Sequence, residues 1–115
     1  MSRRYALTAR ARADLASIAA HIGEVAGPLT AERVVLAFRS AFSVLGRQPN
    51  AGHARDDLTD DASVRFWPVH SWLIAYSGQA RPVTVLAIVH GARQPDELFR
   101  LIAELSRERP GFPRD

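Results

Sequence analysis

Hydrophobic positions in the first half of the chain recur with the period of a helix. Residues 9–25 and 29–46 each carry an apolar side chain every three or four positions, which places these side chains on one helix face. The predicted stripes are Leu15, Ile18, Ile22 and Val25 in the first segment, and Val35, Phe38, Phe42 and Leu45 in the second. Thr8 is the expected N-cap of the first helix. Gly27-Pro28 separates the two segments, because Pro is favoured at a first helical position and disfavoured inside a helix. So short a connection predicts an antiparallel hairpin.

The second half of the chain has the pattern of strands. Residues 3–7 alternate, with Tyr5 and Leu7 on one face, and three further strand-like runs follow at residues 64–69, 72–77 and 82–90. Pro68 interrupts the first of these three runs, and because Pro cannot donate to a sheet ladder, this strand should lie at an edge. The prediction is an α+β fold with the order β-α-α-β-β-β, in which an antiparallel helical hairpin packs on a small, mainly antiparallel four-stranded sheet.

The run from Val83 to Val89 is apolar on both faces, interrupted only by Thr84. Such a strand is normally central and covered on both sides, yet the hairpin can cover only one face. The other face must be shielded by the C-terminal segment, by a second subunit or by a partner. Pro95-Asp96-Glu97 predicts the start of a short C-terminal helix. Its apolar face could dock there through Leu98, Leu101, Ile102 and Leu105.

Length and composition predict one ordinary globular domain. The 115 residues are 47% hydrophobic and 23% charged, and no apolar run approaches the ~20 residues that span a bilayer. We expect a single domain over residues 1–106 and a disordered tail over residues 107–115. The N-terminus has no signal-peptide pattern and the chain has no Cys, which together favour a cytoplasmic location.

All 15 basic side chains are Arg, and the formal net charge is +3. Arg suits anionic partners, but so small an excess permits such a partner without indicating one. The one long loop, residues 49–61, begins with turn-forming residues. Long loops in compact domains are often functional, but we favour the interpretation that this one is a solvated excursion. Within it, Arg55 is expected to pair with Asp56 or Asp57.

Four fragments of the chain occur in the order found in one known superfamily. They are Leu7-Thr8-x-x-Ala11-x-x-Asp14-Leu15-x-x-Ile18, Pro49-x-x-Gly52-x-x-Arg55-Asp56-Asp57-Leu58, Arg65-x-x-Pro68-Val69-x-x-Trp72-Leu73-Ile74-x-Tyr76 and Ile88-Val89-His90-Gly91-Ala92-Arg93. From about Tyr5 to Leu98, the chain thereby resembles the ParE/RelE toxin superfamily, and its opening fragment is similar to the ParE branch. The resemblance implies the toxin of a bacterial type II toxin–antitoxin module. ParE-type members block DNA gyrase, whereas RelE-type members cut messenger RNA on the ribosome.

The two activities require different chemistry. RNA cleavage through the 2′-hydroxyl needs a base, an acid and a cation that stabilises the phosphorane charge. RelE-like nucleases use several Lys and Arg side chains on the open sheet face, but this chain has no Lys. If the protein is a nuclease, the candidate catalytic residues are Arg65, Tyr76, His90 and Arg93, with Arg81 as a further cation. His90 would be the acid or base, and Tyr76 lies near it in one possible register.

Blocking gyrase needs only a complementary surface, for which exposed Arg and aromatic side chains are the usual anchors. We therefore expect no catalytic residue, cofactor or metal, and predict target-binding residues Arg65, Trp72, His90 and Arg93, with Trp67 and the C-terminal helix as further candidates. The expected partners are gyrase and a ParD-like antitoxin whose amphipathic helix and extended tail wrap the toxin, with DNA bound only through the antitoxin and no membrane contact. A RelE-like ribosome-dependent endoribonuclease and a non-toxic, degenerate binding module are the alternatives.

Overall fold

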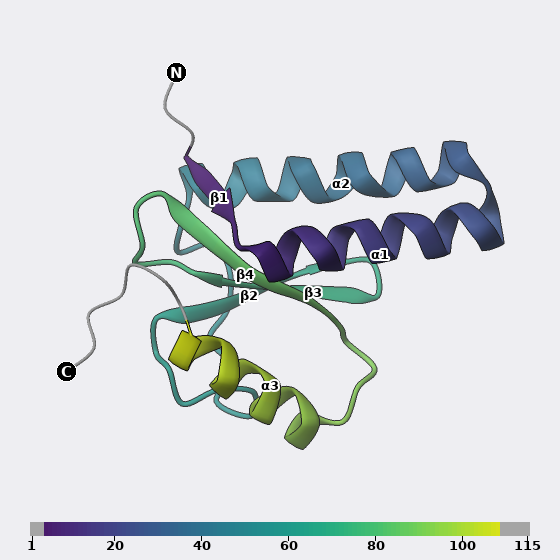
Figure 1. The fold of residues 1–115 in the computed structure, drawn as a ribbon. Coiled ribbons are helices and arrows are strands. Elements are labelled where there is room, and N and C mark those ends of the chain that lie inside the picture. Colours follow the sequence, from purple (N-terminus) through teal and green to yellow (C-terminus); the bar gives the residue numbers. More distant parts are fainter. Residues whose placement is uncertain (1–3, 109–115) are drawn as a thin grey trace.

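The structure, a computed structural model, describes residues 4–108, with side chains up to Leu105. Within these residues the elements follow the predicted order (Figure 1). They are β1 (Tyr5–Leu7), α1 (Ala9–Ala26), α2 (Pro28–Arg47), β2 (Val64–Val69), β3 (Trp72–Ser77), β4 (Val83–His90) and α3 (Pro95–Glu108). Helix α3 continues two residues past the predicted boundary at Ser106, while residues 109–115 of the predicted tail lie outside the described residues.

The four strands form one sheet in the order β1-β4-β3-β2. Strand β1 pairs in parallel with β4, and the β4–β3 and β3–β2 pairs are antiparallel. The α+β prediction with a mainly antiparallel sheet is therefore confirmed. Pro68 lies in β2, an edge strand, as its missing N–H required, and the doubly apolar β4 is central.

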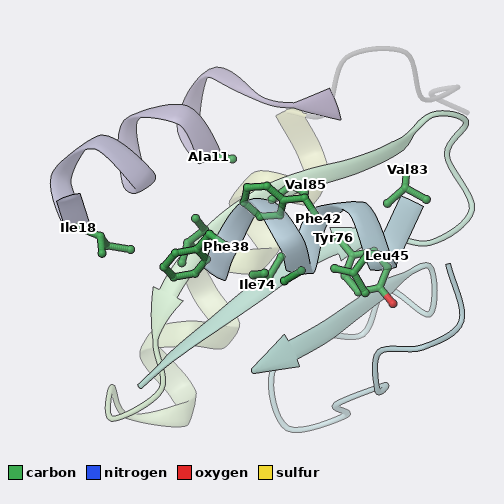
Figure 2. Close-up of a cluster of buried hydrophobic side chains, with 11 residues drawn as sticks. Ala11, Ile18, Phe38, Phe42, Leu45, Ile74, Tyr76, Val83 and Val85 are labelled. Carbon is green, nitrogen blue, oxygen red and sulfur yellow. The ribbon is translucent and has the colours of Figure 1, made fainter. Parts of the chain in front are cut away.

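Each face of the sheet is covered by helices. Helices α1 and α2 lie side by side over one face and α3 lies across the other (Figure 1). On the hairpin side, Phe38, Phe42 and Leu45 of α2 pack with Ile74 and Tyr76 of β3 (Figure 2). On the opposite side, the cluster contains Leu58, Val64, Phe66, Ala75, Leu86, Ala87, Val89, Leu98 and Ile102. The chain's own C-terminal helix thus supplies the second cover that β4 requires.

Two predicted stripe positions are not in the core. Val25 is 65% exposed at the end of α1, where the hairpin extends past the sheet (Figure 1). Val35 of α2 is half-buried and lies in a groove between the helices, outside the buried cluster. The prediction was wrong at both positions because the hairpin is longer than the sheet beneath it and because helix–helix contacts also have an apolar periodicity.

Strand β1 pairs with only the first three residues of β4. Beyond that point, side chains of α1 and of its N-cap form hydrogen bonds with the backbone groups on the unpaired edge of β4. The Thr8 side chain accepts from the Ala11 N–H, which confirms it as N-cap, and its hydroxyl donates to the Leu86 carbonyl at 2.9 Å. The Asp14 carboxylate accepts from the Ile88 N–H at 3.0 Å. Buried backbone groups that lacked these partners would cost free energy, so Thr8 and Asp14 fix α1 along the central strand.

Strand β4 contains a β-bulge that determines which face of the sheet its last side chains occupy. Tyr76 pairs with Val85 and Ala75 with Ala87, so Leu86 has no partner in β3. Val83, Val85 and Ile88 therefore all face the hairpin, whereas Leu86, Ala87 and Val89 face α3. Such a bulge changes the direction of the side chains that follow it, here that of His90.

Among the described helices, none is long and apolar enough to cross a membrane.

Candidate functional site

The four residues predicted for a nuclease site lie at two separate places on the sheet. Arg65 pairs with Tyr76 across β2 and β3, while His90 pairs with Trp72 across β4 and β3. Tyr76 and Trp72 are four residues apart in one strand, about 13 Å at the usual rise of ~3.3 Å per residue. Of the registers that the sequence left open, the one that would bring Tyr76 near His90 does not occur.

Tyr76 is fully buried and both hydrogen-bonding capacities of its hydroxyl are used. The oxygen accepts from the Gly52 N–H at 2.8 Å, and the hydroxyl donates to the Pro49 carbonyl, also at 2.8 Å. Burial raises the pKa of the Tyr76 phenol above its ordinary value of 10.0, although the Gly52 hydrogen bond and the Arg65 charge oppose this shift. The phenol is therefore neutral near pH 7 and holds the turn that begins the long loop.

Arg65 holds the same turn from the neighbouring strand. Its guanidinium Nη1 donates to the Gly52 carbonyl at 2.8 Å. The Tyr76 hydroxyl approaches residue 52 so closely that only Gly fits there, because a Cβ would lie 2.5 Å from the hydroxyl oxygen. The geometry gives both Arg65 and Tyr76 a structural task, in which they hold residues 49–52 against the sheet.

Two other arginines from the sequence predictions also hold loops. Arg55 makes a two-point ion pair with Asp57, at 2.8 and 2.7 Å, so Asp57 rather than Asp56 is its partner. This hydrogen bond lowers the pKa of the Asp57 carboxyl and raises that of Arg55. Arg81 donates from Nη1 to the Gly78 and Ala80 carbonyls within its own turn.

His90 and Arg93 meet at the opposite end of the sheet, beside a small pocket. This sheet-end pocket has a volume of about 170 Å³. Its lining residues are Arg10, Asp14, Ser17, Ile18, Trp72, Ile88, Val89, His90 and Arg93. Three of the four predicted target-binding residues, Trp72, His90 and Arg93, are thereby brought together, and Arg65 is not among them.

The ring of His90 is oriented by two contacts. Its Nδ1 accepts from the Ala92 N–H at 3.1 Å, and the ring meets Trp72 edge-on with centroids 5.9 Å apart. Because Nδ1 is an acceptor, the proton of the neutral ring is on Nε2. In this state His90 offers a hydrogen-bond donor and has no free basic nitrogen, which suits binding better than proton abstraction.

The contribution of α1 to this pocket was not predicted. Arg10 donates from Nε to Asp14 Oδ1 at 2.8 Å, and the other carboxylate oxygen of Asp14 holds β4. Asp14 was part of the opening fragment that resembles ParE-type toxins, but nothing in its local sequence pairs it with a residue 74 positions away. Trp67, in contrast, is half-buried against the core on the hairpin side, away from this pocket.

A second hollow lies between the two helices of the hairpin and β1. This hairpin groove has a volume of about 660 Å³ and is lined by Tyr5, Leu7, Arg12, Leu15, Ala16, Ala19, Val35, Arg39 and Phe42. Its lining is mostly apolar, with one arginine from each helix. Arg12 donates to the Leu7 carbonyl at 2.9 Å, whereas the guanidinium of Arg39 is exposed and has no partner among the described residues.

Comparison with known families identifies the chain. Residues 5–95 match the model of the family described as the ParE toxin of the type II toxin–antitoxin system, parDE. The chain belongs to the ParE toxin family. The match ends where α3 begins, so the helix that covers the second face of this ParE-family sheet lies beyond the matched segment.

A solved structure supports the fold. A chain of the chromosomal ParDE TA system from P. aeruginosa is similar, with a TM-score of 0.63 and 22% sequence identity; the alignment covers 75% of this chain and 92% of that one. At this identity the likeness concerns the ParE fold alone. A search of curated protein sequences found no match.

Proposed function

We propose that this protein is the toxin of a type II toxin–antitoxin module, acting in the cytoplasm by binding and poisoning DNA gyrase, and neutralised by a ParD-like antitoxin. Membership of the ParE family supports the toxin role. The gyrase target follows from the family branch and from the chemistry of the candidate residues.

One observation carries the preference for binding over catalysis. Arg65 and Tyr76 are committed to the turn at residues 49–52, while His90 and Arg93 lie at the other end of the sheet. General acid–base catalysis needs its groups within hydrogen-bond reach of one reacting centre. Four groups divided between two ends of a sheet cannot form one such centre, but a surface with Trp72, His90 and Arg93 can anchor a protein partner.

The hairpin groove is where we place the antitoxin. Its apolar walls suit the apolar side of an amphipathic helix, as in other helix-in-groove complexes. Arg12 and Arg39, one on each helix, make an acidic segment the complementary partner. The antitoxin and the gyrase thereby occupy different surfaces, the groove and the sheet-end pocket.

A supercoiling assay with purified gyrase tests the target. We expect the purified chain to inhibit supercoiling and to cause cleaved DNA to accumulate. The product of an adjacent small gene is expected to be the antitoxin, to co-purify with the chain and to reverse both effects. Uninhibited gyrase in the presence of folded chain would contradict the gyrase proposal.

One observation supports the alternative of a ribosome-dependent endoribonuclease, namely that His90 and Arg93 line the same pocket. Mapping of cellular transcripts after induction distinguishes it. If wild type cleaves messenger RNA and the His90→Ala and Arg93→Ala variants do not, the endoribonuclease activity is established. Growth arrest with intact transcripts would exclude that activity. Normal growth after verified expression of soluble chain would instead favour a degenerate, non-toxic binding module.

A further inference from the structure

The sheet-end pocket contains hydrogen-bond donors that the fold itself does not use. Arg93 is exposed, and its guanidinium has no partner among the described residues. Arg10 donates to Asp14 through Nε alone, and its two terminal amino groups have no partner in the part of the chain that the structure describes. His90 adds an Nε2–H donor, because its Nδ1 accepts from the Ala92 N–H. Three donor groups from two segments of the chain, α1 and the end of β4 with its following turn, therefore line one small hollow.

The charges around the pocket favour an anion with a single negative charge. The pocket is lined by two guanidinium groups, Arg10 and Arg93, and by one carboxylate, Asp14, so with a neutral His90 one positive charge is left uncompensated. Asp14 cannot rotate away to change this balance, because it also accepts from the Ile88 N–H of β4. A carboxylate would compensate the remaining charge through charge-assisted hydrogen bonds, and Arg can make such bonds in pairs.

The size and walls of the pocket indicate how the anion is presented. Its volume of about 170 Å³ is well below the roughly 300–1,000 Å³ of sites that enclose small-molecule ligands. Ile18, Trp72 and Ile88 contribute apolar surface beside the donors. A short apolar stem that ends in a carboxylate fits this combination, whereas a nucleotide with its base and sugar is too large.

We propose that the sheet-end pocket binds the carboxylate of a glutamate side chain from the target protein. The methylene groups of this glutamate pack against Ile18 and Trp72, and its carboxylate accepts from Arg10, Arg93 and His90. The inference rests on the proposed function only for the identity of the target, gyrase. The preference for a carboxylate is a property of this chain and can be tested without gyrase.

The first experiment titrates the isotope-labelled full chain with N-acetyl-glutamate α-amide and follows the ring signals of Trp72 and His90 by NMR. N-acetyl-glutamine α-amide, which has the same shape without the charge, and inorganic phosphate are the comparison probes. We expect the glutamate probe to shift both ring signals with millimolar affinity, and Arg93→Glu to abolish the shifts. Arg33→Glu, at an exposed position on α2, should retain them. Equal shifts with glutamine, shifts with phosphate alone, or no shift would each overturn the proposal.

The second experiment measures the affinity of the same variants for gyrase, with and without DNA. Arg93→Glu should weaken binding by about tenfold or more, in line with the loss of a charged contact, and Arg33→Glu should not. An effect of Arg93→Glu that requires DNA would assign the pocket to a phosphate and overturn the inference. Tight gyrase binding by Arg93→Glu would overturn it too. If the wild-type chain fails to bind gyrase yet the glutamate probe still shifts the rings, the carboxylate site stands and the gyrase target falls.

Discussion

Trp72 and His90 lie directly opposite each other on β3 and β4, with ring centroids 5.9 Å apart and ring planes at 74°. This pairing depends on the bulge at Leu86. With strict alternation from Val83, His90 would share a face with Thr84, away from Trp72. The unpaired residue reverses the alternation, so His90 faces the hairpin and completes the sheet-end pocket.

Replacement of Trp72 should destabilise the protein, whereas replacement of His90 should not. Trp72 also packs edge-on against the buried Phe38, with centroids 5.9 Å apart. Trp72→Ala removes this partly buried aromatic contact and should lower the free energy of unfolding by about 2–4 kcal/mol. His90→Ala, at an exposed position, should stay within about 0.5 kcal/mol of wild type. Urea denaturation followed by circular dichroism measures both, and similar losses in the two variants would contradict this assignment.

Tyr76→Phe tests whether the Tyr76 hydroxyl is structural. The variant leaves the Gly52 N–H and the Pro49 carbonyl without their partner and should cost about 1–3 kcal/mol of unfolding free energy. Expression of Tyr76→Phe should still arrest bacterial growth at a temperature where the variant remains folded. Loss of toxicity with unchanged stability would instead assign the hydroxyl to the activity.

The same hydroxyl predicts a pH dependence. Burial raises the folded-state pKa of Tyr76 above the 10.0 of the free side chain. The resulting stabilisation is fully present below pH 10 and is lost as the pH rises through the folded-state pKa. Between neutral and strongly alkaline pH, the unfolding free energy of wild type should therefore fall more steeply than that of Tyr76→Phe. Parallel pH profiles would contradict the role of burial.

Ser77→Ala should leave stability unchanged or increase it. The Ser77 hydroxyl is buried at the end of β3, and its oxygen has no hydrogen-bond partner within the part of the chain that the structure describes. Burial of an unpaired hydroxyl is unfavourable, so its removal should stabilise the fold by up to about 1 kcal/mol, measured by urea denaturation. Destabilisation by a similar amount would mean that the hydroxyl has a partner, such as a bound water.

The elements could be predicted from the sequence because each has a local signal. The helices follow from an apolar periodicity, their boundary from Gly27-Pro28 and the edge strand from Pro68. Each of these signals lies within a few residues, and the predicted elements agree with the structure. The register of β4 could not be predicted, because a run that is apolar on both faces fits either alternation equally well. Tyr76 beside His90 was one register that the sequence left open, and the observed register instead places Tyr76 opposite Val85.

The role of α1 was hidden for a related reason. Asp14 and Ile88 are 74 positions apart, and a polar residue on an amphipathic helix normally faces solvent. Only the early end of β1, which leaves part of the β4 edge unpaired, creates the need for a side-chain acceptor there. Contacts that compensate for an incomplete strand pairing leave no periodic trace in the sequence.

The docking of α3 can be tested at its most buried position. Ile102 is fully buried against the second face of the sheet, so Ile102→Ala should cost about 2–4 kcal/mol of unfolding free energy. Glu104→Ala, exposed on the same helix, is the matched control and should change stability by less than about 0.5 kcal/mol. Equal stabilities of the two variants would mean that α3 leaves the sheet in solution.

If the antitoxin binds the hairpin groove, as proposed above, it should require Arg39. Arg39→Glu reverses the charge of an exposed guanidinium that has no partner among residues 4–105, and it should weaken antitoxin binding by about tenfold or more, most strongly at low salt. Replacement of Arg12 would also remove its hydrogen bond to the Leu7 carbonyl, so a loss of binding could not be assigned to charge alone. Arg33→Glu makes the same change on α2 outside the groove and should bind normally. Titration calorimetry with the purified antitoxin measures the difference. If both variants bind equally well, the antitoxin occupies another surface, and the apolar groove needs a different explanation.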